Sequence, residues 1–173
     1  MLPGPRLSLA AFEPEIFLIM SQCHLILWRH AEAEEGFPDH VRALTERGHR
    51  QARQVAHWLK IHLPLEPRIL VSPAQRTQQT ASAFSRHFET VSHLGTHARP
   101  RDLLQACAWP TPADPYTLLV GHQPTLGETA AWLLTGEPAP WSVRKGALWW
   151  LTQRERDGRP QLILRAVIDP ELI

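Results

Sequence analysis

The sequence has only two cysteines, Cys23 and Cys107, and they are not arranged as a Cys-x-x-Cys pair. So few thiols exclude a disulfide framework and are typical of a cytoplasmic protein whose cysteines stay reduced. No apolar run approaches the ~20 residues that a membrane-spanning helix needs. An excess of charge is also missing, because 18 Lys and Arg against 17 Asp and Glu leave a net charge of +1. We therefore expect no membrane segment and no broad basic surface for nucleic acid.

Motifs for metal and nucleotide binding are missing as well. His57 and His62 are five positions apart rather than four, and no carboxylate completes a His-Glu-x-x-His helix. The stretch 121–127 is not a phosphate loop of the Gly-x₄-Gly-Lys-Ser/Thr type. We find no internal repeat and no low-complexity tract. The expectation is a protein without a metal site or an organic cofactor.

The chain of 173 residues, 43% of them apolar, has the size of one domain with an ordinary hydrophobic core. Its first nineteen residues are different in character. Their brief apolar stretch, 7–12, is interrupted by charged residues and proline and has no cleavage site, so it does not resemble a signal peptide. We predict an N-terminal extension at 1–19 and a folded domain at 20–173, with translation starting at either Met1 or Met20.

The remainder alternates strand-like and helix-like stretches. Flat apolar patterns predict buried strands at 24–28, 68–71 and 117–120. Amphipathic or proline-initiated stretches predict helices around 44–60, 74–88 and 125–134. Two further strands are expected at 147–152 and 161–167, joined by a turn at Asp157-Gly158, with loops at 100–115 and 136–141. This order predicts an α/β fold, a small single domain with a mostly parallel central sheet and helices on both faces.

Polar residues follow each of the three buried strands. Arg29 and His30 end the first, Ser72 ends the second with Arg76 shortly after it, and His122 ends the third. The carboxyl ends of parallel strands lie along one edge of a sheet, where ligands bind. We therefore expect Arg29, His30, Arg76 and His122 to meet at one site.

Two prolines strengthen this prediction. Pro73 and Pro124 follow the second and third strands, and we expect each at the first position of a helix. Both helices would then direct their positive N-terminal ends toward the same edge. Taken singly, the polar residues fit a solvated strand end, a helix surface or a turn. Together, two guanidinium groups, two imidazoles and two helix ends predict a site for a tetrahedral anion such as a phosphoryl group.

Four stretches in this order resemble the motifs of the histidine phosphatase superfamily, the phosphoglycerate-mutase-like group. They are LWRHAE at 27–32, LTERG at 44–48, VSPAQRTQQTA at 71–81 and VGHQP at 120–124. The compact length and short middle loops resemble the SixA-type phosphohistidine phosphatases. The resemblance implies that His30 is the nucleophile, that Arg29 and Arg76 bind the phosphoryl oxygens, and that His122 completes the pocket. It implies a covalent phosphohistidine intermediate and no requirement for a metal.

The chain departs from the family pattern in two respects. Ala31 replaces the usual glycine after the histidine, which is tolerable where the backbone φ is negative. The middle region offers no clear proton donor, and Asp102, Glu32 and Glu34 are the candidates. An imidazole leaves phosphorus readily without an acid, because the pKa of its conjugate acid lies near 6.5, whereas an alkoxide does not.

These observations favour a phosphatase that acts on phosphohistidine in a protein. A phosphomonoesterase for a small phosphorylated metabolite is the alternative, and a phosphate-binding interaction module with little turnover is a second one. The expected partner is thus a phosphorylated protein or a small phosphorylated substrate. The sequence leaves the oligomeric state open.

Overall fold

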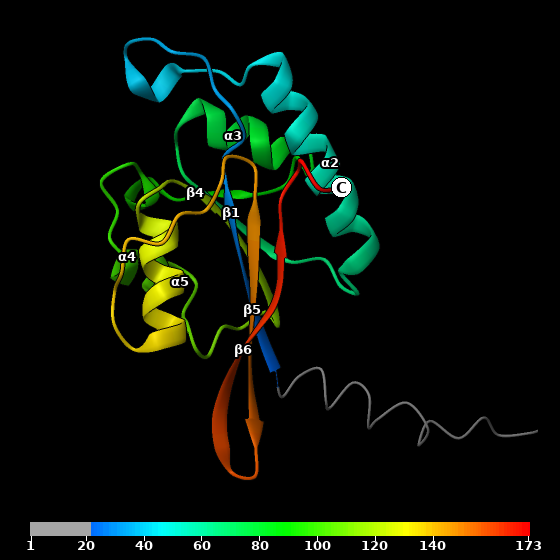
Figure 1. Ribbon diagram of the computed structural model, residues 1–173, viewed down its shortest axis with the longest axis vertical. Helices are drawn as coiled ribbons and strands as arrows, with labels where there is room; N and C mark the ends of the chain where they lie inside the picture. The colour runs from blue at the N-terminus through cyan, green and yellow to red at the C-terminus, as the bar shows by residue number, and fades with distance from the viewer. Residues whose placement is uncertain (1–21) are drawn as a thin grey trace, which may run out of the picture.

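The computed structural model describes residues 22–173, so the predicted extension at 1–19 and the alternative start at Met20 lie outside the described residues. The described chain forms a six-stranded sheet in the order β3-β2-β4-β1-β5-β6 (Figure 1). Its strands are β1 (Gln22–Arg29), β2 (Arg68–Val71), β3 (Glu89–Thr90), β4 (Tyr116–Gly121), β5 (Leu148–Arg156) and β6 (Arg159–Ile168). All five predicted strands are present, and the two-residue β3 is an addition.

The sheet is mostly parallel, as predicted. β1 pairs with β4, β4 with β2, and β2 with β3 in parallel, whereas β5 runs antiparallel to both β1 and β6. Asp157 and Gly158 join β5 to β6 with positive φ angles of 53° and 69°, the left-handed conformations that a tight hairpin turn requires. Figure 1 shows this hairpin extending beyond the rest of the domain.

Helices cover both faces of the sheet. They are α2 (Glu46–His62), α3 (Gln75–Ser82), α4 (Pro100–Ala106) and α5 (Thr125–Thr135), with short 3₁₀ turns η2 (Asp39–Val41) and η3 (Ser92–Leu94). Alternate residues of β1 divide between two apolar clusters, because successive side chains of a strand point to opposite faces. Ile26 and Trp28 pack with α2, whereas Leu25 and Leu27 pack with α4 and α5. The predicted architecture, an α/β domain with a covered sheet, is confirmed. None of the helices in 22–173 has the length and apolarity to cross a membrane.

The start of α2 is fixed to the end of β1 by backbone contact. Thr45 caps the helix, its hydroxyl accepting the N–H of Gly48 at 2.9 Å. A side chain at Gly48 would bring its Cβ within 1.9 Å of the carbonyl oxygen of Glu32, so this position requires glycine. The LTERG stretch thus brings α2 against the chain that follows His30. The C-terminal residues also lie against α2 (Figure 1), where the side chain of Gln54 donates to the carbonyl of Ile173 at 3.1 Å.

Three predictions about helix boundaries are wrong. Pro73 precedes the N-cap Ala74, and Pro124 is itself an N-cap, so neither proline is the first helical residue. In α3 the cause is local: the carbonyl of Ser72 accepts from the side chains of Thr77 and Gln78, and the helical bonds begin at Ala74.

The predicted helix at 74–88 ends at Ser82. The chain must then place Glu89 and Thr90 beside Leu70 and Val71 of β2, which leaves no room for a longer helix. The predicted loop at 100–115 contains α4, which begins with Pro100 and is capped by Asp102, whose carboxylate accepts the N–H of Arg99.

Candidate active site

The carboxyl ends of β1, β2 and β4 lie level with one another. In the sheet register, Val120 of β4 is opposite both Trp28 and Val71. Beyond these rungs, the N–H groups of His30 and Ser72 donate to the carbonyls of Gly121 and Val120, each at 3.1 Å. The polar residues that follow the three strands are therefore held together by backbone hydrogen bonds.

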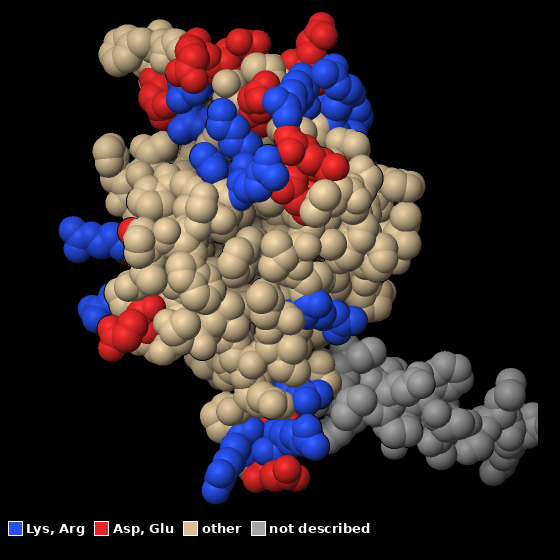
Figure 2. Space-filling model, viewed as in Figure 1, with Lys and Arg blue, Asp and Glu red and all other residues tan. Residues whose placement is uncertain are grey.

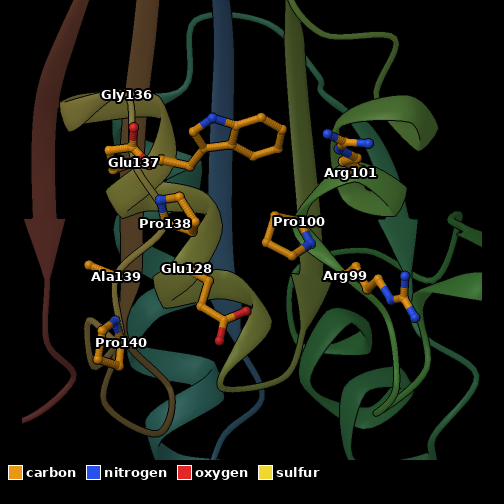
Figure 3. Close-up of a pocket in the computed structure, with 10 residues that line it drawn as sticks. Arg99, Pro100, Arg101, Glu128, Gly136, Glu137, Pro138, Ala139 and Pro140 are labelled. Carbon is orange, nitrogen blue, oxygen red and sulfur yellow. The ribbon is translucent and has the colours of Figure 1, made fainter.

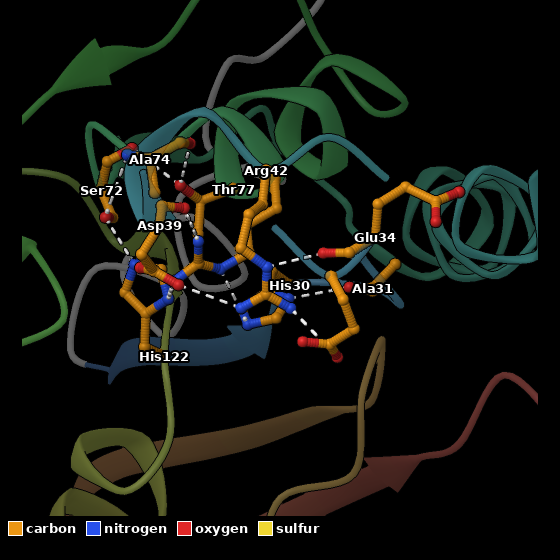
Figure 4. A network of polar contacts seen from close by, with 11 residues as sticks. His30, Ala31, Glu34, Asp39, Arg42, Ser72, Ala74, Thr77 and His122 are labelled. Carbon is orange, nitrogen blue, oxygen red and sulfur yellow. Dashed lines mark hydrogen bonds and ion pairs between the residues drawn. The ribbon is translucent and has the colours of Figure 1, made fainter. Parts of the chain in front are cut away.

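The predicted convergence of His30, Arg76 and His122 is present in the structure. Figure 4 shows the two histidines close together. Nε of Arg76 lies 3.3 Å from Nε2 of His30, and Nη2 of Arg76 lies 3.4 Å from Nδ1 of His122. The two imidazole rings are 5.3 Å apart between centroids. Their exposed fractions are only 9% for His30, 3% for Arg76 and 4% for His122. The cluster is thus a recessed site, closed on most sides by protein.

His30 is held in one tautomer. Its Nδ1 lies 2.8 Å from the carbonyl oxygen of Ala31, a pure acceptor, so Nδ1 carries the proton. The lone pair of Nε2 then faces the Nε–H of Arg76. Ala31 stands at the usual glycine position. Its φ is not positive, so its side chain causes no backbone strain there.

The environment keeps His30 neutral. Its pKa is lowered to about 3, chiefly by burial, with smaller contributions from the charges of His122, Arg76 and Arg29. The positive charges of Arg29 and Arg76 each add to this shift. The larger cause is burial, which sequence spacing does not reveal.

Ser72 orients His122. Its position at the end of a strand was predicted from the sequence, but this role was not. The hydroxyl of Ser72 lies 2.7 Å from Nε2 of His122, and Ser72 is fully buried. Burial lowers the pKa of His122 to about 4, with Arg76 adding to the shift. Both imidazoles of the site are therefore uncharged at neutral pH.

Arg29 approaches the site from the last position of β1. Its Nη1 donates to the carbonyl of Val143 at 2.7 Å, and burial lowers its pKa. Its Nε is one of two buried side-chain polar atoms in 22–173 that have no hydrogen-bond partner. A buried donor without a partner is costly unless a ligand or water completes it. Arg29 thus retains a free donor, and its charge adds to the lowering of the pKa of His30.

Asp39 is the site residue that sequence reasoning missed. It lies in η2, within the segment 30–45 that joins β1 to α2. Its carboxylate accepts from Nη2 of Arg76 at 2.9 Å, and its backbone carbonyl accepts from Nη1 at 2.7 Å. Hydrogen bonds from Arg76 and Arg42 hold the pKa of Asp39 below its usual value. Sequence position gives no signal for this contact, because an isolated aspartate in a polar loop is usually solvated.

Two of the three candidate proton donors, Glu32 and Asp102, are engaged elsewhere. Glu32 accepts from the hydroxyl of Thr45 at 3.0 Å and pairs with Arg47 at 3.4 Å, so its carboxylate belongs to the start of α2. Asp102 caps α4, its carboxylate accepting the N–H of Arg99 at 2.8 Å. It also lines a cavity of about 330 Å³, which is lined by Ser72 and Asp39 as well and therefore adjoins the site. Glu34 is exposed, and its carbonyl accepts from Arg42.

A wider cavity of about 780 Å³ lies between α4 and α5 (Figure 3). It is lined by Arg99, Arg101, Glu128 and Glu137, together with prolines and Trp132, and it contains none of the four predicted site residues. Its charges are of both signs, so they do not form an anion site. The converging donors, rather than the larger volume, therefore locate the candidate active site.

Charged groups on the face in Figure 2 gather at its upper end, where both signs are interspersed. This end carries α2 and the segment 30–45 in the same view (Figure 1). Within residues 22–173, no group of three or more His, Cys, Asp or Glu side chains is arranged to hold a metal ion. The positive charge at the site comes from Arg29 and Arg76.

Buried neutral histidines make stability depend on pH. The pKa values of His30, His122 and His24 are lowered from 6.5 to about 3, 4 and 4, so below pH 6.5 the unfolded chain binds protons that the folded chain does not. Each histidine is expected to reduce the free energy of unfolding by up to about 1.4 kcal/mol per pH unit as the pH falls from 6.5 toward 4. Urea unfolding at several pH values measures this slope.

His24 allows the pH prediction to be tested outside the site. It is buried against Thr152 and Trp150. His24→Gln is expected to reduce the slope by about one proton. An unchanged slope in His24→Gln would contradict the account.

Comparison with known proteins agrees with this geometry. Residues 25–102 match the family model of the histidine phosphatase superfamily, branch 1. An uncharacterized protein of Mycobacterium leprae is 31% identical over 129 residues, which cover 62% of this chain and 71% of that protein.

Solved structures of similar fold include two SixA proteins. A protein of Nakamurella multipartitia proposed to be the phosphohistidine phosphatase SixA has 28% identity and a TM-score of 0.71, covering 86% of this chain and 96% of that one. The protein histidine phosphatase SixA in complex with tungstate has 25% identity and a TM-score of 0.73, covering 86% and 98%. The fold also occurs in a phosphoserine phosphatase of Entamoeba histolytica at 19% identity and a TM-score of 0.59, covering 84% and 96%. This chain belongs to the histidine phosphatase superfamily and is a phosphatase with the α/β fold of the SixA proteins.

Proposed function

We propose that this phosphatase hydrolyses phosphohistidine in proteins through a covalent intermediate on His30, without a metal ion. The observation that carries the proposal is the state of His30. Its imidazole is neutral, its Nδ1 proton is fixed on the carbonyl of Ala31, and its Nε2 lone pair faces the guanidinium of Arg76. A neutral, oriented imidazole beside cationic donors is the arrangement that nucleophilic attack on a phosphoryl group needs.

The reaction has two displacements. In the first, Nε2 of His30 bonds to phosphorus, and the bond from phosphorus to the leaving group breaks with the electron pair going to that group. Arg76, the free Nε of Arg29, and His122 stabilise the charge on the phosphoryl oxygens. In the second, water attacks phosphorus, the bond to Nε2 breaks, and inorganic phosphate leaves while His30 regains its neutral form. We therefore propose catalytic roles for Arg29, Arg76 and His122.

The surroundings of the site favour a P–N bond as the one that breaks. Asp39, the carboxylate nearest to Arg76, has a lowered pKa and is held ionised by two arginines, so it is a poor acid. Asp102 lines the adjoining cavity, but its carboxylate accepts a hydrogen bond within the cap of α4. An imidazole leaves phosphorus as a weak base whose conjugate acid has a pKa near 6.5, so it needs no general acid, whereas an alkoxide leaves as a strong base and does need one.

The size of the adjoining cavity supports a side chain as the group that carries the phosphoryl. Pockets for drug-sized molecules measure about 300–1,000 Å³, and this cavity of about 330 Å³ is at the lower end of that range. One imidazole occupies a small part of it. Its lining includes the side chains of Ser72, His93 and His97, which can form hydrogen bonds with a heteroaromatic ring.

A phosphomonoesterase for a small metabolite is the second candidate, and the position of Asp102 at the cavity favours it. Comparing turnover of a phosphohistidine peptide with that of a panel of phosphoesters distinguishes the two. We expect kcat/KM to be at least about 10²-fold higher for the peptide. Cleavage of a phosphoester needs a general acid, which contributes about this factor and which the site does not supply. Phosphoesters cleaved as fast as the peptide would overturn the proposal.

Asp102→Asn refines the same comparison. The substitution preserves the shape of the side chain but cannot donate a carboxylic proton. We expect it to leave hydrolysis of the phosphohistidine peptide within about twofold. A loss of phosphoester hydrolysis alone, of about 10²-fold or more, would identify Asp102 as a proton donor and favour the second candidate.

We further propose that the catalytic domain comprises residues 20–173 and that the protein acts in the cytoplasm. The location is supported by the two cysteines, Cys23 and Cys107, which are both free thiols. Mass spectrometry of the N-terminal peptide of the native protein tests the boundary, since a peptide that spans positions 19 and 20 would exclude a start at Met20.

A further inference from the structure

The contacts of Arg76 divide its guanidinium into two edges. The edge formed by Nε and Nη2 faces Nε2 of His30 at 3.3 Å and Nδ1 of His122 at 3.4 Å. The terminal edge formed by Nη1 and Nη2 donates to Asp39 twice, to its backbone carbonyl at 2.7 Å and to its carboxylate at 2.9 Å. From this division we propose that Asp39 is a positioning residue, which holds Arg76 so that its Nε–Nη2 edge points at the phosphoryl group. The inference rests on the proposed function.

The two contacts to Asp39 are the short ones, and the two contacts to the histidines are long. Charge-assisted hydrogen bonds of 2.7–2.9 Å are strong and directional. Bonds of 3.3–3.4 Å to neutral imidazole nitrogens are weak and easily replaced by the oxygens of a phosphoryl group. Asp39 therefore fixes the guanidinium, while the edge that faces the histidines remains available to the substrate.

Asp39 is itself held in place by the segment that carries it. Its Oδ1 accepts from Nη1 of Arg42 at 3.0 Å, and Nε of Arg42 donates to the carbonyl of Glu34 at 2.6 Å. The carboxylate is thus bound on one oxygen by Arg42 and on the other by Arg76. Asp39 is the only acidic residue in 22–173 that is paired with Arg76.

A competing interpretation predicts the opposite change in rate when the charge of Asp39 is removed. If Asp39 occupied the place of the phosphoryl oxygens, removing its charge would free Arg76 and increase activity. The edge assignment argues against this, since Asp39 and the two imidazoles contact different sides of the guanidinium. The direction of the change in rate therefore decides between the two.

Asp39→Asn is the principal variant, and Glu35→Gln is its matched control. Glu35 lies in the same segment, is 92% exposed and pairs with Arg42 at 3.5 Å, but it has no contact with Arg76. Turnover of a phosphohistidine peptide is measured for both variants. We expect kcat to fall by about 10- to 100-fold in Asp39→Asn, as for a misplaced catalytic group, and to stay within about twofold in Glu35→Gln. An unchanged or increased kcat in Asp39→Asn would overturn the inference.

A double-mutant cycle shows whether Asp39 acts through Arg76. If it does, Asp39→Asn has no further effect once Arg76 has been replaced by alanine. Equal fold-losses in the Arg76→Ala and wild-type backgrounds would assign Asp39 an independent role and overturn the inference. Thermal unfolding of each variant identifies any general loss of structure.

Nuclear magnetic resonance separates this inference from the proposed function. The Nε–H signal of Arg76 in the free protein reports its orientation without any turnover. We expect this signal to be sharp in the wild type and in Glu35→Gln, and shifted and broadened in Asp39→Asn. An unaltered signal in Asp39→Asn would refute positioning even if the wild type is active. An inactive wild type with the expected signals would instead refute the proposed function.

Discussion

Replacing His30 with alanine is expected to abolish turnover, with a loss in kcat on the order of 10⁴-fold or more, because the nucleophile is removed. No other side chain replaces it. The second imidazole, His122, is held at its Nε2 by Ser72, and we assign it to the phosphoryl oxygens rather than to phosphorus. Steady-state hydrolysis of a phosphohistidine peptide measures the loss.

Two further variants serve as controls for this result. His57→Ala removes an exposed histidine of α2 and is expected to retain full activity. His30→Asn keeps a polar side chain of similar reach, so it distinguishes the loss of the nucleophile from a collapse of the buried cluster. If His30→Ala kept a tenth of the wild-type rate with a normal unfolding transition, His30 would not be the nucleophile.

Replacing Arg76 with alanine is expected to lower kcat by about 10²- to 10³-fold, since a donor aimed at the transition-state charge is lost. The substitution removes two kinds of contact together. Arg76 contributes a positive charge to the site, and it contributes the paired donors Nε and Nη2 that face His30 and His122. Turnover of the phosphohistidine peptide is again the measurement.

Arg76→Lys separates the charge from the paired donors. Lysine keeps the charge but lacks the planar fork, so we expect it to recover only a small part of the lost rate. Arg53→Ala, on the exposed face of α2, is the control and is expected to be fully active. Full recovery by lysine would show that charge alone is needed, and an unchanged rate in Arg76→Ala would remove this residue from the mechanism.

Much of the fold could be predicted because local patterns and tertiary structure agree in it. β4 is buried at all six positions, and its flat apolar run indicates a central strand. Strands of this kind end level at one edge, so the residues after them meet. This is why Arg29, His30, Arg76 and His122 could be named from the sequence, and why Asp157-Gly158 could be placed in a hairpin turn.

The remaining features depend on tertiary contacts that leave no local pattern. The length of α3 is limited by the pairing of Glu89 and Thr90 with β2, a contact of only two residues. The position of Asp39 depends on the path of an exposed segment over Arg76. The low pKa of His30 depends mainly on burial, which is a property of the completed fold. Sequence reasoning therefore located the strands and the donors but not the residues that orient them.

The most direct test of the mechanism is the identity of the phosphorylated residue. The wild-type enzyme is mixed with a phosphohistidine peptide, stopped within the first turnover by denaturation at alkaline pH, where phosphohistidine survives, and digested for mass spectrometry. We predict one phosphoryl group per chain on the peptide that contains His30, and none in His30→Ala. Rapid hydrolysis with a phosphoryl group on another residue, or with no phosphoenzyme at any time, would contradict the account.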